Sequence, residues 1–99
     1  MISDYEIRDS TGANCGREVF DTLGEKYRNL CFWFEGNKNA DYNAVFDVEG
    51  RAVYIELKGW VDQSKMRICG ADKTEIDKIR KTIESFFETR DHPVKLVDK

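Results

Sequence analysis

Hydrophobic and polar residues alternate along residues 41–48 and 52–58, and a two-residue period is typical of β-strands with one buried face. In the second segment, AVYIELK, the valine, isoleucine and leucine share one face, whereas Tyr54, Glu56 and Lys58 share the other. A short turn containing glycine joins the two segments. The pattern therefore predicts an antiparallel hairpin with one apolar face and one charged face.

Helical spacing of apolar residues appears in two other segments, residues 14–29 and 71–91. Gly24 interrupts the first segment, while Asp72 or Thr74 can cap the start of the second. The apolar positions are Val19, Phe20, Leu23 and Tyr27 in the first segment, and Ile76, Ile79, Ile83, Phe86 and Phe87 in the second. Each set forms a stripe along one side of a helix, so we expect both helices to cover a sheet.

The rest of the chain gives shorter signals. The aromatic run at residues 30–34 and the segment 94–97 predict strands, whereas residues 59–70 lack a clear period and predict a loop with a short extended piece. The expected order is α-β-β-β-α-β. We therefore predict one α/β domain over residues 1–99, with a mixed central sheet of about four strands flanked by helices.

Composition narrows the class of protein. The chain has 99 residues, of which 40% are hydrophobic and 35% are charged, with a net charge of −3. This balance is typical of a folded single domain rather than a disordered chain. An acidic protein does not hold nucleic acid by bulk charge, so any contact with DNA must be local, assisted by a metal, or shared between subunits.

The same composition predicts a cytoplasmic protein. The start of the chain lacks the basic and apolar regions of a signal peptide, and no stretch approaches the roughly 20 apolar residues of a membrane helix. Cys15, Cys31 and Cys69 are odd in number and widely spaced, which favours free thiols in a reducing compartment. With His92 as the one histidine, a zinc site is not expected.

The charged face of the hairpin is the strongest candidate for chemistry. Glu56 and Lys58 are two residues apart on a strand, so both project from the same face. A second carboxylate is expected from the neighbouring strand. Asp47 lies close to the turn and should pair near Ala52, whereas Asp41 should lie level with Lys58 and beside Glu56. Two such carboxylates would bind Mg²⁺, with Mn²⁺ able to substitute, and a lysine would stabilise charge growing on a phosphate.

The segment that contains Asp41, Glu56 and Lys58 resembles the signature of a known family of nucleases. The stretch D41-YNAVFDVEGRAVYI-E56-L-K58 resembles the signature of PD-(D/E)xK nucleases, most closely that of small Holliday-junction resolvases and related phage or restriction-type endonucleases. The likeness spans roughly residues 12–97, and Ala40 stands where the signature has proline. It implies a restriction-endonuclease-like core, with Asp41, Glu56 and Glu18 holding the metal and Lys58 as the catalytic lysine.

The implied activity is metal-dependent hydrolysis of phosphodiester bonds in DNA, on branched or otherwise structured substrates, by a homodimer with no membrane association. Beside this site, Trp60, Lys65 and Arg67 form a candidate DNA-binding edge in which the aromatic ring stacks on bases and the cations contact phosphates. An aromatic residue at a strand end is more often part of a core, which is the plainer interpretation of Trp60.

Plainer interpretations exist for the other residues as well. Glu56 and Lys58 can form an ion pair on a solvated sheet face, Asp41 can be a turn residue, and Glu18 can be an ordinary acid on a helix surface. The alternative function is a non-catalytic binding or inhibitor protein on a nuclease-like scaffold, of the kind that phages encode. Its acidic surface would engage a nucleic-acid-binding protein by presenting charge that resembles phosphate.

Overall fold

The computed structural model describes residues 1–7, 16–35, 41–59, 64–88 and 96–98, which form six strands and two helices. In chain order the elements are β1 (Ile2–Ile7), α2 (Gly16–Lys26), β2 (Arg28–Glu35), β3 (Asp41–Val48), β4 (Arg51–Gly59), β5 (Ser64–Cys69), α3 (Lys73–Glu88) and β6 (Leu96–Asp98). The class is α/β, as the sequence predicts. Neither described helix is both long and apolar enough to cross a membrane.

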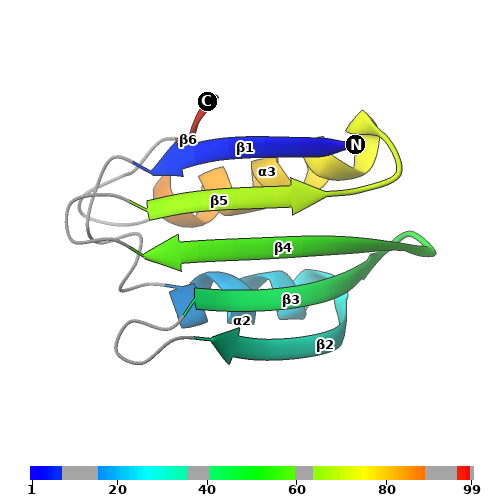
Figure 1. Cartoon of the computed structure of the whole chain (residues 1–99). Helices are drawn as coiled ribbons and strands as arrows, with labels where there is room; N and C mark the ends of the chain where they lie inside the picture. The colour runs from blue at the N-terminus through cyan, green and yellow to red at the C-terminus, as the bar shows by residue number, and fades with distance from the viewer. Residues whose placement is uncertain (8–15, 36–40, 60–63, 89–95, 99) are drawn as a thin grey trace.

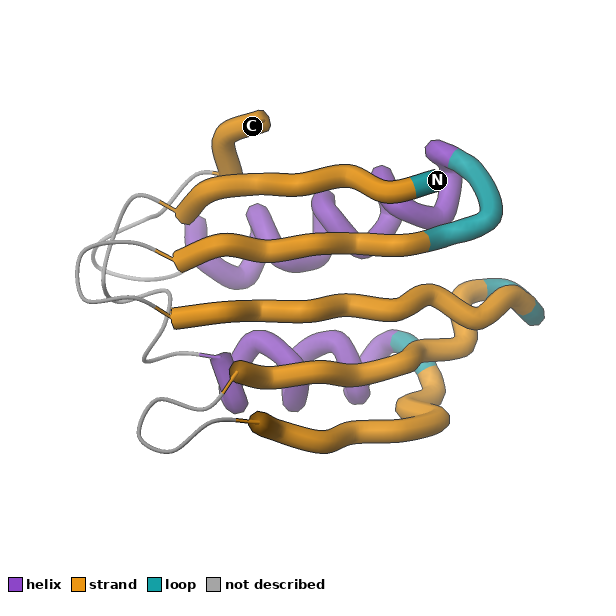
Figure 2. The backbone as a smooth tube through the Cα atoms, in the orientation of Figure 1, coloured by secondary structure: helices purple, strands orange, loops and turns teal. Residues whose placement is uncertain are grey.

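The strands form one sheet in the order β2-β3-β4-β5-β1-β6, and every pairing within it is antiparallel. Both helices lie behind this sheet in Figure 1, with α2 behind β2 and β3, and α3 behind β5 and β1. The backbone trace in Figure 2 shows the same two-layer arrangement. One face of the sheet is therefore covered by helices, and no described element covers the other, which we call the open face.

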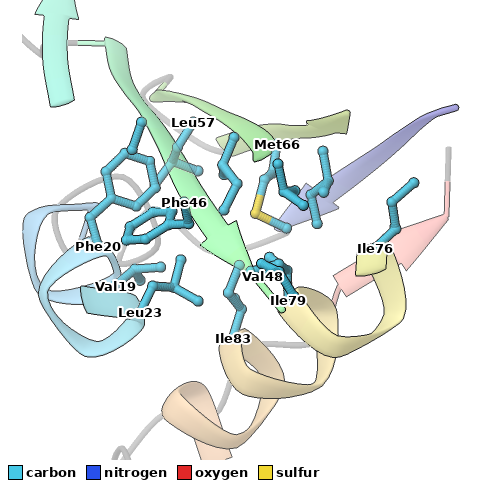
Figure 3. Close-up of a cluster of buried hydrophobic side chains, with 14 of the residues drawn as sticks. Val19, Phe20, Leu23, Phe46, Val48, Leu57, Met66, Ile76, Ile79 and Ile83 are labelled. Atoms are coloured by element: carbon cyan, nitrogen blue, oxygen red, sulfur yellow. The ribbon is translucent and has the colours of Figure 1, made fainter. Parts of the chain in front are cut away.

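The core fills the space between the sheet and the two helices (Figure 3). Ala44, Phe46 and Val48 of β3 are buried there, and the Phe20 ring of α2 meets the Phe46 ring edge-on with centroids 6.3 Å apart. The other fully or nearly fully buried apolar side chains are Tyr5, Val19, Leu23, Val53, Ile55, Leu57, Met66, Ile68, Ile76, Ile79 and Ile83. The predicted helix stripes and the apolar face of the hairpin are thus confirmed for the side chains that the structure describes, which do not include that of Phe87.

The hairpin between β3 and β4 has the predicted register. Asp47 pairs with Ala52, as expected, and the turn consists of Glu49 and Gly50, which both have positive φ angles of 55° and 90°. Two central residues of this kind match the twist of the flanking strands. The Gly50 amide donates a hydrogen bond of 2.7 Å to the Asp47 carboxylate, which fixes the turn.

The start of α3 is tied to the hairpin through a small ionic network. Asp72 caps the helix by accepting a hydrogen bond of 2.9 Å from the amide of Thr74. The Glu75 carboxylate accepts a bond of 2.9 Å from the amide of Ala71, and its other oxygen lies 3.1 Å from Nε of Arg51. Because the Glu75 side chain is 8% exposed, Arg51 compensates a nearly buried charge.

Three details of the predicted fold are wrong. The sheet is antiparallel rather than mixed, it has six strands rather than about four, and it contains β1, which the sequence did not predict. In the segment 59–70, predicted as a loop with a short extended piece, residues 64–69 form a complete strand. In both β1 and β5 polar and apolar residues are equal in number, because one face meets the core and the other carries charges.

Candidate functional site

One row of side chains crosses the open face from strand to strand. The register places Trp33 of β2, Asn43 of β3, Glu56 of β4, Arg67 of β5 and Asp4 of β1 opposite one another in succession. Neighbouring strands lie about 4.8 Å apart, so each member of the row is next to the following one. The row joins an aromatic ring, an amide and three charges on a single surface.

Glu56 lies at the centre of this row and is held by two donors. Nζ of Lys58 lies 3.0 Å from one carboxylate oxygen, and the hydroxyl of Tyr54 lies 3.0 Å from the other. The Glu56 side chain is 20% exposed, compared with 48% for Lys58. The ion pair of the plainer interpretation is therefore present, and it is anchored on the more buried partner.

These contacts set the charge of Glu56. Partial burial raises the pKa of its carboxyl group, but the hydrogen bonds from Lys58 and Tyr54 and the charges of Lys58 and Arg67 lower that pKa by more. The net pKa lies below the usual value of 4.5. Glu56 is therefore ionised at neutral pH. A carboxylate has about four acceptor positions, so two donors leave positions that a cation can use.

Tyr54 links Glu56 to the neighbouring strand. Its hydroxyl oxygen lies 2.6 Å from the side-chain oxygen of Asn43 as well as 3.0 Å from Glu56. One hydroxyl proton cannot serve two acceptors, and ionised Glu56 is the stronger one. The side chains of Asn43 and Glu56 are therefore joined through the Tyr54 hydroxyl oxygen. Asn43 is 3% exposed, so this network is largely shielded from water.

A shallow hollow of about 150 Å³ opens beside Glu56, between β4, β5 and β1. Its charged lining residues are Asp4, Glu56, Lys58, Lys65 and Arg67. Three cations against two carboxylates give the hollow a net charge of +1, in a chain whose net charge is −3. The hollow is therefore locally cationic on an acidic protein, with Lys58 paired to Glu56 and Arg67 paired to Asp4.

Arg67 and Asp4 close one side of the hollow. Nε of Arg67 lies 2.8 Å from one oxygen of Asp4, and a terminal guanidinium nitrogen lies 3.2 Å from the other oxygen. This two-bond geometry fixes the guanidinium plane. Arg67 consequently stands between the carboxylates of Asp4 and Glu56.

The aromatic end of the row is also organised. The rings of Trp33 and Tyr54 are stacked, with centroids 5.8 Å apart and planes inclined by 24°. Both side chains are partly exposed. Because Tyr54 also reaches Glu56, the aromatic pair is continuous with the charged hollow.

The predicted site residues separate into two groups. Glu56, Lys58, Lys65 and Arg67 all line the hollow, so the structure brings four of them together. Glu18 is exposed on α2, which packs on the helical side of the sheet, whereas Glu56 belongs to the open face. The structure does not bring these two carboxylates together.

The structure describes the backbone of Asp41 and does not describe Trp60. Asp41 is the first residue of β3, and the pairing of Tyr42 with Leu57 sets its backbone level with Lys58, as the sequence predicts. The placement of its side chain lies outside the described part of the structure, and so does all of Trp60. Among the side chains that the structure describes, no group of three or more His, Cys, Asp or Glu residues is arranged to hold a metal ion.

Comparisons with known protein families, curated proteins and solved structures found no match to this chain. The chemistry of the site therefore rests on its own geometry.

Sequence reasoning missed three members of the row, Trp33, Asn43 and Asp4, and also Tyr54 beside it. Asn43 and Tyr54 were recoverable, because each shares a strand face with a residue already singled out, Asp41 and Glu56 respectively. Asp4 had no signal of its own, since β1 was not predicted. Trp33 lies in an apolar run in which the sequence does not reveal which aromatic residue faces away from the core.

Proposed function

We propose that this protein is a metal-dependent endonuclease that hydrolyses phosphodiester bonds in DNA. The observation that carries the proposal is the meeting of Glu56, Lys58, Lys65 and Arg67 around one hollow. An ionised carboxylate next to a lysine, with two further cations within the same hollow, is suited to a phosphate group and to the charge that grows on it during hydrolysis.

Each residue has a distinct part in this proposal. Glu56, together with Asp41 from the adjacent strand, would hold Mg²⁺, and the bound ion would supply an acidified water molecule and a Lewis acid. Lys58 would leave its ion pair with Glu56 to stabilise the phosphate. Lys65 and Arg67 would contact neighbouring phosphates. Glu18, which the resemblance added to the metal ligands, has no part because it lies on the helical side of the sheet.

The proposal extends to the fold and assembly. The succession α2, β2, β3, β4, α3 and β6 has the α-β-β-β-α-β order along the chain that a restriction-endonuclease-like core of PD-(D/E)xK nucleases would have, although β5 and β1 lie between β4 and β6 in the sheet. A homodimer acting on branched DNA would supply a second cationic hollow, which offsets the acidic balance of a single chain.

The test is cleavage of supercoiled plasmid and of four-way-junction DNA with Mg²⁺ or Mn²⁺. We expect cleavage by the wild type, and a loss of roughly 100-fold or more in Glu56→Gln and in Lys58→Met, the range for removing a group that acts on the transition state. Lys81→Met, which removes an exposed cation on α3, is the control and should retain activity. Activity that survives both site substitutions would point to a contaminating nuclease and end the proposal.

A second candidate is a non-catalytic binding or inhibitor protein, whose partner would contact the acidic remainder of the chain rather than the cationic hollow. It is favoured by the fact that both oxygens of Glu56 already have donors and that Arg67 is held by Asp4. Contacts between side chains are therefore enough to hold these groups in place, and no metal ion is needed for that. Calorimetric titration with Mn²⁺ separates the two candidates. Heat of binding that disappears in Glu56→Gln supports the nuclease, whereas no heat, together with co-purification of a basic partner protein, supports the inhibitor.

A further inference from the structure

We propose that the open face binds unpaired bases of single-stranded DNA, which stack on Trp33 while the phosphates of the same strand contact Lys58, Lys65 and Arg67. This inference rests on the proposed function, because it specifies which form of DNA the hollow receives. It adds a binding site, the aromatic pair Trp33–Tyr54, that the predicted nuclease residues do not include.

Trp33 lies at the end of the aromatic stack that is nearer the border of the sheet. Its ring stacks on Tyr54 at one side, with centroids 5.8 Å apart. On the other side lies the border of the sheet, because β2 is the terminal strand in the order of the strands and pairs with β3 alone. Among the described elements none continues the sheet beyond β2, and Trp33 is partly exposed. A base can therefore extend the existing two-ring stack by one further ring.

The aromatic pair Trp33–Tyr54 is connected to the cationic hollow through Glu56. The Tyr54 hydroxyl is 3.0 Å from Glu56, and the opposite oxygen of Glu56 is 3.0 Å from Lys58. The aromatic pair and the cations thus lie on one connected face, with Trp33 and Arg67 three strand spacings apart, or about 14 Å. A strand of DNA that crosses the sheet meets first an aromatic ring and then the cationic hollow.

The chemistry of these contacts favours single strands over duplex. Bases in a duplex are stacked on one another and their faces are not accessible to a protein ring, whereas unpaired bases offer both faces. Aromatic stacking combined with a cationic groove is the common mode of single-strand recognition, and it does not require a particular base. A hollow with a net charge of +1 supplies a local phosphate contact without making the whole chain basic.

Trp33 itself provides the readout. In a Trp60→Phe background Trp33 is the one remaining tryptophan, because the chain has two. Oligothymidylate of about 12 nucleotides, a length within the range bound by single-strand modules, is titrated in EDTA at low salt so that no cleavage occurs. We expect quenching of Trp33 fluorescence, and an affinity roughly tenfold higher than that for a duplex of the same length.

Two comparisons decide the inference. An abasic strand of equal length keeps the phosphates and lacks the bases, so it should bind the unaltered protein roughly tenfold more weakly than oligothymidylate. By anisotropy of labelled DNA, Trp33→Leu should weaken binding to a similar extent and Trp33→Phe by less, whereas Leu30→Ala, which removes another exposed apolar side chain from β2, should not.

Equal affinity for abasic and normal strands would overturn the inference, and this comparison does not depend on any variant folding. Binding without cleavage under any divalent ion would instead remove the nuclease and leave the single-strand site. Cleavage of duplex DNA with no preference for single strands would remove the single-strand site and leave the nuclease. The two proposals therefore fail in different experiments.

Discussion

The hydroxyl of Tyr54 lies 3.0 Å from a carboxylate oxygen of Glu56, and the two residues are neighbours on one face of β4. This contact couples the aromatic half of the open face to its charged half. It also contributes, together with the stronger contact from Lys58, to the low pKa of Glu56.

The pKa of Glu56 gives a prediction about pH. A carboxyl group whose pKa is lowered by folding stabilises the protein at pH values above its unfolded pKa, and this contribution is lost as the pH falls through the lower, folded pKa. Lys58→Met keeps the burial of Glu56 and removes its main hydrogen bond and nearest positive charge. We therefore expect the pKa of Glu56 to rise, as measured by NMR titration of its side-chain carboxyl carbon.

Lys65→Met is the matched control for that experiment, because Lys65 lines the same hollow and makes no contact that lowers the pKa of Glu56. An equal shift in both variants would mean that general charge, and not the contact at 3.0 Å, sets the ionisation of Glu56. The stability of the Lys58→Met variant should also depend less on pH in the acidic range below 4.5.

Asn43→Asp should create a carboxylate pair across β3 and β4, because Asn43 is directly opposite Glu56 in the register. Two like charges at a site that is 3% exposed should lower the free energy of unfolding by about 1–3 kcal/mol at pH 7. Millimolar Mg²⁺ should restore much of this loss, since two carboxylates suit a hard cation. Thermal unfolding with and without Mg²⁺ measures both effects.

Asn29→Asp adds the same charge at an exposed position on β2 and is the control. It also removes the hydrogen bond of 3.2 Å that Asn29 donates to the Cys31 carbonyl, so it should cost about 0.5–1.5 kcal/mol, but its stability should not respond to Mg²⁺. If Mg²⁺ leaves the unfolding of Asn43→Asp unaltered, the open face is not organised to admit a divalent ion next to Glu56.

The link between the hairpin and α3 predicts a stability difference between two ion pairs. Arg51→Met leaves the nearly buried carboxylate of Glu75 without its cation, which should cost about 1–3 kcal/mol. Lys78→Met removes the partner of Glu49, whose side chain is 71% exposed, and should cost less than about 1 kcal/mol. Denaturation by urea compares the two variants, and equal losses would show that burial of Glu75 is not the deciding factor.

Two glycines should respond in opposite directions to replacement by alanine. Gly50 has a φ of 90°, so Gly50→Ala should lower the free energy of unfolding by about 1–2 kcal/mol even though there is space for a methyl group. Gly24 lies inside α2 with open space around it, so Gly24→Ala should raise that free energy by about 0.5–1 kcal/mol. Urea denaturation of both variants gives the two signs directly, and the same sign in both would contradict this account of the turn.

The elements that sequence reasoning predicted are those whose signals are local. The hairpin register follows from the alternation around Phe46 and Ile55, and α3 follows from the spacing of Ile76, Ile79 and Ile83. The direction and order of the strands depend instead on partners far apart in the chain, such as Tyr5 and Met66. No local pattern encodes such a pairing, so the sheet was predicted as mixed and β1 was missed.

The candidate site also contains residues that local spacing predicts and residues that only the order of the strands brings together. Glu56 and Lys58 were placed together because their spacing on one strand determines that they share a face. Lys65 and Arg67 were linked to them by their position in the sequence, and the alternation of β5 explains why both lie on the open face. The partnership of Arg67 with Asp4 joins residues 63 positions apart, and only the arrangement of the strands reveals it.

The place of β1 between β5 and β6 has a consequence for how the molecule is assembled. Its partners are residues 64–69 and 96–98, so it is synthesised long before either of them. The meander from β2 to β5 closes through short connections, while β1 gains its hydrogen bonds only after a large loop has been brought together, at an entropic cost. If β1 were displaced, the border of β5 would be left unpaired and able to pair with another chain.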